Sequence, residues 1–314
     1  MAAERIGAAI DVGSNSVHLL VAAVGDEGLR PLADESVFLG LGTAVAEGRA
    51  LDATGRGSLT QSLVDYAARA KALSAESMVV LGTEPVRRAP NASRIVASAG
   101  AAGVPIQVLT HEEEALLTLI GVTEGRAVSS DLVVVDVGGG SSEVCVVGPV
   151  GPSRAIGVRL GSASLTAAHV THDPPTTEEV EAMRADARRL ISGNVPAHVE
   201  DIVAVGGTAT NLGRVVASDR AGAAVIDRPA IAAALASLSE QPAAEAALRF
   251  GVNPIRAQVL PAGAVILDAI LAEAGADRLR ISDASIREGA LLVADHAGPA
   301  WRDRLGELAH GWRA

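Results

Sequence analysis

The sequence predicts an α/β protein made of two similar domains that face a shared cleft. Residues 10–17 read IDVGSNSV, and residues 133–144 read VVVDVGGGSSEV. Each stretch has the pattern of a buried strand, an Asp-Val-Gly turn and a second strand, and the two aspartates lie 125 residues apart (136 − 11). A third stretch, residues 203–210, runs from an apolar strand into Gly-Gly-Thr. Glycine turns in corresponding positions indicate a repeated domain.

The length of the chain agrees with this organisation, since 314 residues suffice for two domains with separate cores. We expect the first domain to span residues 1–125 and the second to span 126–314. The hinge is expected between Gly121 and Ser130, where the periodicity is lost. The last helix, at about 298–312, is a candidate to pack back on the first domain.

Hydrophobic periodicity and turn residues predict the elements of both domains. In the first domain we expect a hairpin at 6–24, a strand ending near 39, a glycine-rich loop at 40–57, a helix at 59–73, a strand at 78–81, a helix at 91–102 and a strand at 104–109. In the second we expect strands at 131–137, 142–148, 153–160 and 279–282, with helices elsewhere and a kink at Pro261. Capping boxes are predicted at Thr110/Glu113 and Thr176/Glu179.

The hairpin at 133–144 has the residues of a metal and phosphate site. If Gly139 and Gly140 form a two-residue turn, Asp136 faces Glu143 with Cβ atoms about 5 Å apart. Two carboxylates this close repel, and a hard divalent cation such as Mg²⁺ or Mn²⁺ would remove the repulsion. The glycine N–H groups can meet a phosphate oxygen because no Cβ obstructs them. The alternative interpretation is an ordinary hairpin with exposed carboxylates.

A helix that starts after Thr110 supplies a candidate general base. Glu112 complements the helix dipole and Glu113 completes the capping box, but Glu114 has no local role. A carboxylate just beyond a strand end can take a proton from a water molecule in a cleft. Arg87 and Arg88 are expected in a loop beyond another strand end, where ligand groups commonly lie; a solvated basic loop is the alternative.

Composition argues against several classes of partner. The formal charge of −11 and an aromatic content of 2 % are unfavourable for binding nucleic acid. The longest uninterrupted apolar runs fall short of the ~20 residues of a membrane span. The N-terminal stretch enters a strand without a signal core, which predicts a cytoplasmic protein. Cys145, the single cysteine, lies in the apolar run VCVVG and is expected to be buried.

Together these segments resemble the exopolyphosphatase and guanosine pentaphosphate phosphohydrolase (Ppx/GppA) family, within the actin, sugar kinase and heat-shock ATPase fold. The resemblance covers nearly the whole chain. Its motifs are AAIDVGSNSVHLLVA, GTEPVRRAPNAS, EEALLTLIGV, LVVVDVGGGSSEV, AVGGTATNL and AGAVILDAIL through IREG. It implies two ribonuclease H-like (actin-like ATPase) domains facing a central cleft.

The resemblance also implies roles by position. Glu114 matches the catalytic glutamate, and Asp136 and Glu143 match an acidic pair that acts in catalysis. Phosphate binding is implied for Asp11, Ser14, Asn15, Arg87, Gly138, Gly139, Gly140, Ser141, Gly206, Gly207 and Thr208. The expected ligands of Mg²⁺ or Mn²⁺ are Asp136, Glu143 and Asp11.

The function predicted from these residues is metal-dependent hydrolysis of the terminal phosphate of inorganic polyphosphate, by a homodimer. Three alternatives stay open: hydrolysis of guanosine pentaphosphate, an ATP-dependent kinase with residues 206–208 near the nucleotide, and a catalytically weakened phosphate-binding regulator. The last is suggested by Leu116, because the family usually has arginine two places after the catalytic glutamate. The chain also has Thr110-His111 where the family usually has Ser-Gly.

Overall fold

The computed structural model describes residues 4–25, 28–45, 48–199, 201–217 and 222–313, and the chain forms two compact units. Unit 1 consists of Met1–Ala127 and Ala284–Ala314, and unit 2 of Val128–Asp283. The first crossing between the units lies inside the stretch that the sequence marks as a hinge. The second crossing has no such signal, and the segment after it belongs to unit 1 although the sequence placed most of it in the second domain.

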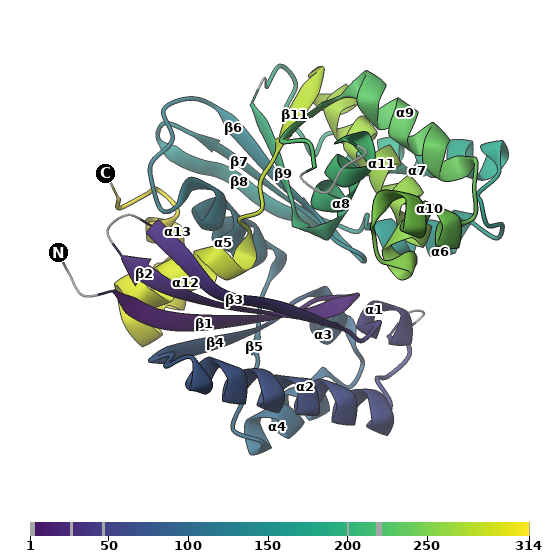
Figure 1. Cartoon of the computed structure of the whole chain (residues 1–314). Helices are drawn as coiled ribbons and strands as arrows, with labels where there is room; N and C mark the ends of the chain where they lie inside the picture. The colour runs from purple at the N-terminus through teal and green to yellow at the C-terminus, as the bar shows by residue number, and fades with distance from the viewer. Residues whose placement is uncertain (1–3, 26–27, 46–47, 200, 218–221, 314) are drawn as a thin grey trace. The chain divides into compact units, whose positions relative to one another are not determined.

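Unit 1 is built on a five-stranded sheet of order β3-β2-β1-β4-β5. Strands β1 to β3 are antiparallel, whereas β4 and β5 run parallel to β1 (Figure 1). The strands are β1 (Arg5–Val12), β2 (Ser16–Gly25), β3 (Gly28–Phe38), β4 (Ser77–Gly82) and β5 (Gln107–Val108). The parallel strands therefore all end at the edge of the sheet where the β1–β2 hairpin turns.

The helices of unit 1 come from both ends of the chain. They are α1 (Leu41–Ala44), α2 (Ala53–Ala72), α3 (Glu84–Arg88), α4 (Ala92–Ala101), α5 (His111–Thr123), α12 (Ile286–Ala297), the 3₁₀ helix η2 (Gly298–Arg304) and α13 (Leu305–Leu308). Helices α5 and α12 meet at two glycines. A Cβ on Gly121 would lie 2.1 Å from the Ser285 carbonyl oxygen, and one on Gly289 would lie 1.9 Å from that of Leu117. No side chain fits at this crossing, so α12, which comes from the C-terminal part of the chain, is an integral part of unit 1.

Unit 2 repeats the sheet of unit 1 and adds one strand. Its order is β10-β11-β9-β6-β7-β8, so that β8-β7-β6-β9-β11 matches β3-β2-β1-β4-β5 in order and direction. The strands are β6 (Leu132–Val137), β7 (Ser142–Gly148), β8 (Gly151–Val158), β9 (Ile202–Val205), β10 (Val225–Asp227) and β11 (Arg278–Ile281). The register between the second and third strands shifts at Val21/Ala22 in one unit and at Val146/Val147 in the other, again 125 residues apart. The predicted repeat of the domain is confirmed.

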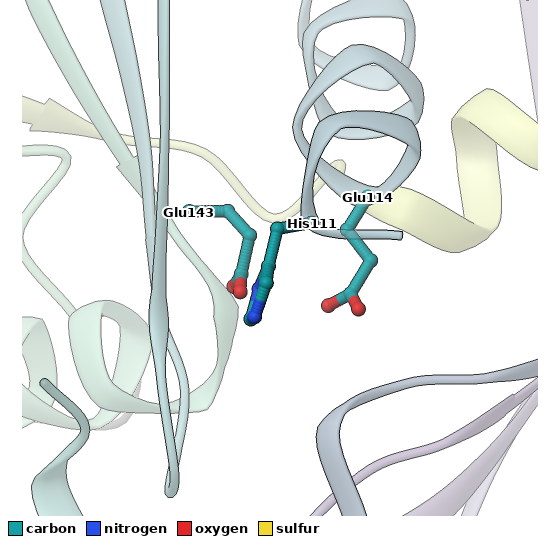
Figure 2. A group of neighbouring side chains, drawn as sticks. All are labelled: His111, Glu114 and Glu143. Carbon is teal, nitrogen blue, oxygen red and sulfur yellow. The ribbon is translucent and has the colours of Figure 1, made fainter. Parts of the chain in front are cut away.

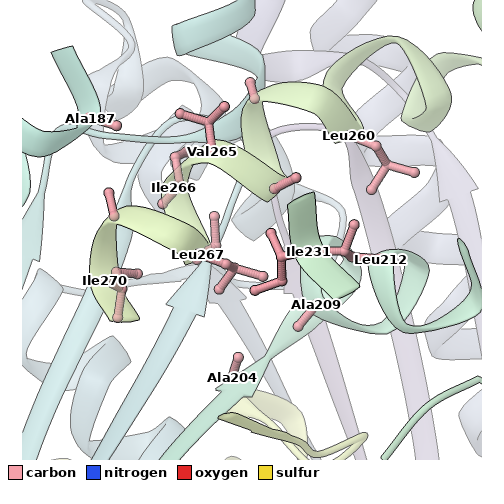
Figure 3. Close-up of a cluster of buried hydrophobic side chains, with 14 of the residues drawn as sticks. Ala187, Ala204, Ala209, Leu212, Ile231, Leu260, Val265, Ile266, Leu267 and Ile270 are labelled. Atoms are coloured by element: carbon pink, nitrogen blue, oxygen red, sulfur yellow. The ribbon is translucent and has the colours of Figure 1, made fainter. Parts of the chain in front are cut away.

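The helices of unit 2 enclose its core. They are α6 (Ser162–His169), α7 (Thr177–Ile191), α8 (Gly206–Ala217), α9 (Arg228–Ser239), α10 (Ala243–Phe250) and α11 (Pro254–Ala274). Figure 3 shows Leu212 of α8, Ile231 of α9 and Leu267 of α11 in this core, all at most 1 % exposed. Helix α11 has the length and hydropathy of a membrane span, but 67 % of that window is buried inside the protein. Its apolar composition therefore has an explanation in the core of unit 2.

Most predicted elements are confirmed, and the errors have local causes. Helix α2 begins at Ala53, six residues earlier than expected, because Asp52 accepts a hydrogen bond from the Gly55 N–H and caps the helix. The expected loop at 40–57 is correspondingly shorter. Strand β5 has only two residues, and β10 was not predicted. Helix α11 is continuous through Pro261, and the kink there stays a prediction. Both predicted capping boxes are present.

Candidate active site

The β6–β7 hairpin of unit 2 has the predicted register. Asp136 lies opposite Glu143, and the Gly138 N–H donates to the Ser141 carbonyl at 2.9 Å, which closes a two-residue turn of Gly139 and Gly140. Residues opposite one another on antiparallel strands share a sheet face. Glu143 is 5 % exposed and accepts a 2.8 Å hydrogen bond from the Ser141 hydroxyl. The hairpin thus holds two carboxylates on one face of the sheet.

Asp136 lies against Gly206 at the start of α8. A Cβ on Gly206 would stand 2.4 Å from its Oδ1 atom, so only glycine allows this approach. Burial raises the pKa of Asp136 from 3.8 to about 6. A half-buried carboxylate beside a second carboxylate is an all-oxygen donor set, which suits Mg²⁺ or Mn²⁺. The residues present therefore fit the expected metal.

The glycine turn of unit 2 directs its carbonyl groups to one side. The Gly138 and Gly139 carbonyls accept hydrogen bonds from the Ser162 and Ser164 N–H groups at the start of α6, both at 2.9 Å. Within the described residues, the N–H groups of Gly139 and Gly140 have no acceptor. Two adjacent N–H groups in a tight turn without protein acceptors form a concave anion-binding element. The predicted phosphate role of this turn is consistent with that geometry.

The β1–β2 turn of unit 1 has the same construction. Gly13 N–H donates to the Ser16 carbonyl at 3.1 Å, which leaves Ser14 and Asn15 as the central residues. Their carbonyls accept hydrogen bonds from N–H groups of the segment 39–42 at 2.7–3.0 Å. In the described part of the chain the Ser14 and Asn15 N–H groups find no acceptor. The Ser14 hydroxyl donates to Glu84 at 2.9 Å, so its backbone is the available phosphate donor.

Asp11 occupies the position in unit 1 that Asp136 occupies in unit 2. It lies opposite His18 on β2 and beside Leu81 on β4. His18 thus stands where unit 2 has Glu143, since both are seven residues beyond the aspartate. The acidic pair has no counterpart at this position of unit 1, and Asp11 is a weaker candidate than Asp136 for a metal ligand.

The first turn of α5 presents Glu114 as expected (Figure 2). Glu114 is 5 % exposed, and its carboxylate pairs with the guanidinium of Arg87. Arg87 also donates to the Leu109 carbonyl at 2.7 Å and lies 2.9 Å from His111 Nδ1. The predicted phosphate-binding arginine and the candidate base are therefore in contact within unit 1. Figure 2 also shows Glu143, which projects from β7 of unit 2.

The position of Arg87 corrects one prediction. Arg87 and Arg88 lie in helix α3 and not in a loop, because Pro85 stands in the first turn, where its fixed φ favours helix formation. Arg88 pairs with Glu84 one turn earlier at 3.0 Å. A helix of five residues is too short to show a periodic pattern of apolar residues, so the sequence did not reveal α3. The helix fixes the direction in which Arg87 extends toward Glu114.

Arg256 is a candidate that the sequence analysis missed. A Cβ on Gly207 would lie 2.1 Å from its Nη1 atom, so the guanidinium rests on the Gly206-Gly207-Thr208 turn at the start of α8. Among the described residues it has no hydrogen-bond or ion-pair partner. Burial and the neighbouring Arg214 lower its pKa. A half-buried guanidinium without a carboxylate beside a helix N-terminus favours an anionic ligand.

Two ribonuclease H-like units, each with a hairpin turn whose central N–H groups find no acceptor among the described residues, define an actin-like protein. The Ppx/GppA phosphatase family matches residues 20–296, and the chain belongs to this family. Exopolyphosphatase 2 of Mycobacterium tuberculosis is 31 % identical over 93 % of this chain and 99 % of its own length. The guanosine-5'-triphosphate,3'-diphosphate pyrophosphatase of Vibrio cholerae is 28 % identical over 90 % of this chain and 58 % of its own length.

The structural comparison agrees with the family assignment. The crystal structure of the Aquifex aeolicus Ppx/GppA family member superposes with a TM-score of 0.82 at 28 % identity, covering 95 % of this chain and 99 % of that one. The resemblance inferred from the motifs is confirmed, and so is the fold of two actin-like domains. The protein is a hydrolase that acts on phosphoric anhydrides.

Proposed function

We propose that this chain is an exopolyphosphatase that removes the terminal phosphate of inorganic polyphosphate with the help of a divalent metal. The observation that carries the choice of substrate is sequence identity. Exopolyphosphatase 2 is 31 % identical over 93 % of this chain, whereas the guanosine-5'-triphosphate,3'-diphosphate pyrophosphatase is 28 % identical over 90 %. A homodimer remains a prediction of the family resemblance, and a cytoplasmic location remains a prediction from the N-terminal stretch.

The residues of unit 1 are assigned to the attacking water and the phosphate. Glu114 orients the water and accepts its proton, since a carboxylate within hydrogen-bond reach of a water can serve both purposes. Arg87 exchanges its contact with Glu114 for the oxygens of the terminal phosphate, to which a guanidinium donates two parallel hydrogen bonds. This exchange frees the carboxylate when substrate arrives. The Ser14 and Asn15 N–H groups supply further donors.

The residues of unit 2 are assigned to the charge on the phosphate chain. Asp136 and Glu143 would hold the metal, with Asp11 as a further candidate ligand from unit 1, and a bound divalent ion neutralises charge that develops on the transferring group. The N–H groups of Gly139 and Gly140 donate to phosphate oxygens, and Arg256 with the turn 206–208 binds a phosphate beside α8. Both units have to engage the same phosphate chain for this scheme to operate.

The test is phosphate release from polyphosphate, guanosine pentaphosphate and ATP, each measured with Mg²⁺, with Mn²⁺ and with EDTA. We expect metal-dependent release from polyphosphate at a kcat/KM at least about tenfold above that for the other two substrates, a difference of about 1.4 kcal/mol in transition-state binding. A higher kcat/KM for guanosine pentaphosphate would refute polyphosphate as the preferred substrate and favour guanosine pentaphosphate. Phosphate release that persists in EDTA would refute the metal requirement. Binding of polyphosphate without hydrolysis would favour a phosphate-binding regulator.

A further inference from the structure

The segment that follows α12 contacts both ends of α5, the helix that carries Glu114. At the C-terminal end of α5, the Trp312 and Arg313 N–H groups donate to the Gly125 carbonyl at 2.9 and 3.0 Å. Gly125 has φ +72°, and a Cβ there would lie 2.9 Å from the Trp312 ring. The indole in turn stacks on His296 with ring centroids 4.9 Å apart. This end of the helix is held by backbone hydrogen bonds and ring packing.

At the N-terminal end of α5 the contact is made by one side chain, Arg302 of η2. Its Nε and Nη2 atoms donate to the two carboxylate oxygens of Glu113 at 2.5 and 2.8 Å, and Nη2 also donates to the Val108 carbonyl at 2.7 Å. The neighbouring Trp301 is 2 % exposed, which fixes the base of the arginine. Arg302 therefore ties the last residue of β5 to the first turn of α5.

The contact goes beyond what the helix cap needs. Glu113 already accepts from the Thr110 N–H at 2.7 Å, and the Thr110 hydroxyl accepts from the Glu113 N–H at 3.1 Å. Burial alone would raise the pKa of Glu113, but the hydrogen bonds from Arg302 and Thr110 outweigh it and lower the pKa. The Arg302 and Glu113 side chains are 38 % and 19 % exposed, so the pair adds little stability, typically under about 1 kcal/mol.

We propose that Arg302 is a positioning residue. It holds the first turn of α5 in the orientation in which Glu114 contacts the attacking water while Arg87 binds the phosphate. The inference rests on the proposed function, because it assumes that Glu114 is the base. Glu113 and Glu114 are adjacent, so a rotation of the first turn that loosens one side chain redirects the other. A displacement of about 1 Å at a catalytic group can cost up to about a hundredfold in rate.

The experiment uses the full chain with Arg302→Gln, Arg302→Lys and Glu113→Gln. Phosphate release from polyphosphate is measured with a thermal melt beside it. We expect Arg302→Gln to lower kcat about tenfold with KM within twofold of the wild type, and to lower the melting temperature by less than about 3 °C. Arg302→Lys should retain part of kcat, because lysine keeps the positive charge. The recovery should be incomplete, because an ammonium group cannot donate the two parallel hydrogen bonds that the guanidinium makes to Glu113. The double variant Arg302→Gln/Glu113→Gln should be no slower than the slower single variant.

A matched control lies two residues away. Arg304 also pairs with a glutamate, Glu307, at 3.0 Å, but this partner lies on its own segment, three residues along, and not on α5, so Arg304→Gln should leave kcat unchanged. An unchanged kcat for Arg302→Gln, or an equal loss for Arg304→Gln, would overturn the inference. The Glu114→Gln variant separates the two levels of the argument. If Glu114→Gln stays active, the proposed base is wrong, and the role of Arg302 is refuted with it. If Glu114→Gln is inactive while Arg302→Gln has normal activity, only the role of Arg302 is refuted.

Discussion

The two hairpin turns share one backbone construction and differ in side chains. In each, an N–H to C=O bond closes a two-residue turn, and the carbonyls of the turn are held by the helical segment that follows the third strand. The central residues are Ser14 and Asn15 in unit 1 but two glycines in unit 2. The residue opposite the aspartate is His18 in one unit and Glu143 in the other.

This difference distinguishes the features that both units share from the side chains that are assigned to the reaction. The N–H groups of the turn have no acceptor among the described residues of either unit, so the proposed anion binding depends on the shared backbone. The acidic pair occurs at this position of the unit 2 hairpin alone, and the metal is therefore assigned first to Asp136 and Glu143. The candidate base lies outside both hairpins, on α5. Each of these assignments can be tested against its counterpart in the other unit or in the same turn.

Loss of the base should have the largest effect. Glu114→Gln keeps the shape of the side chain and removes its basicity, so we expect kcat to fall at least about a hundredfold while KM stays near normal. Glu112→Gln is the matched control, because Glu112 is exposed in the same turn. Glu113→Gln is unsuitable as this control, because it also breaks the ion pair with Arg302. Full activity of Glu114→Gln would refute water activation by this residue.

Loss of the acidic pair should come next. Asp136→Asn is expected to lower kcat/KM at least about tenfold and to raise the Mg²⁺ concentration for half-maximal rate, because an amide is a poorer ligand than a carboxylate. Asp11→Asn should have the smaller effect, since its cross-strand neighbour is His18. Metal titrations of phosphate release for both variants make the comparison. A larger shift for Asp11→Asn would assign the metal to unit 1.

The pH dependence of stability tests the burial of Asp136 without using activity. Its pKa in the folded protein, about 6, exceeds the usual 3.8, so the folded state holds a proton that the unfolded state has released between about pH 4 and 6. Stability should fall as pH rises through this window, by at most about 3 kcal/mol. Asp136→Asn in EDTA should therefore melt higher than the wild type above pH 6 and equally at pH 4. A constant difference across this range would contradict the assignment.

Building the acidic pair into unit 1 should have the smallest effect. His18→Glu places a second carboxylate opposite Asp11, and like charges directly opposite one another cost up to about 1 kcal/mol. We expect a lower melting temperature in EDTA, with part of the loss recovered in Mg²⁺. His18→Gln is the uncharged control and should show no such recovery. If Mg²⁺ stabilises both variants equally, the facing carboxylates alone do not make a metal site.

Local patterns were sufficient for the hairpins and the helix caps. The alternation of strand residues and the two-residue turn determine which residues face one another, so the pairing of Asp136 with Glu143 follows from sequence alone. The capping box at Thr110 likewise involves residues three apart. These predictions depend on neighbours in the chain, and the structure confirms them.

Contacts between distant residues could not be predicted in this way. Arg256 lies 49 residues beyond the turn on which its guanidinium rests (256 − 207), and Arg302 lies 189 residues beyond Glu113. No periodicity or spacing connects such positions. Arg256 is a phosphate candidate because no carboxylate among the described residues pairs with it, and this becomes visible only when the side chain is placed.

The discontinuity of unit 1 has a consequence for biosynthesis. Unit 2 is one continuous stretch of the chain. Unit 1 is complete only when α12 has been synthesised, because Gly289 of α12 packs against α5. During translation at about 5–20 residues per second, unit 2 can fold while the N-terminal segment still lacks its last helix. The turn that carries Glu114 receives its Arg302 contact later still. Unit 1 of a nascent chain would therefore complete its fold only after residues 284–313 have left the ribosome, and so later than unit 2.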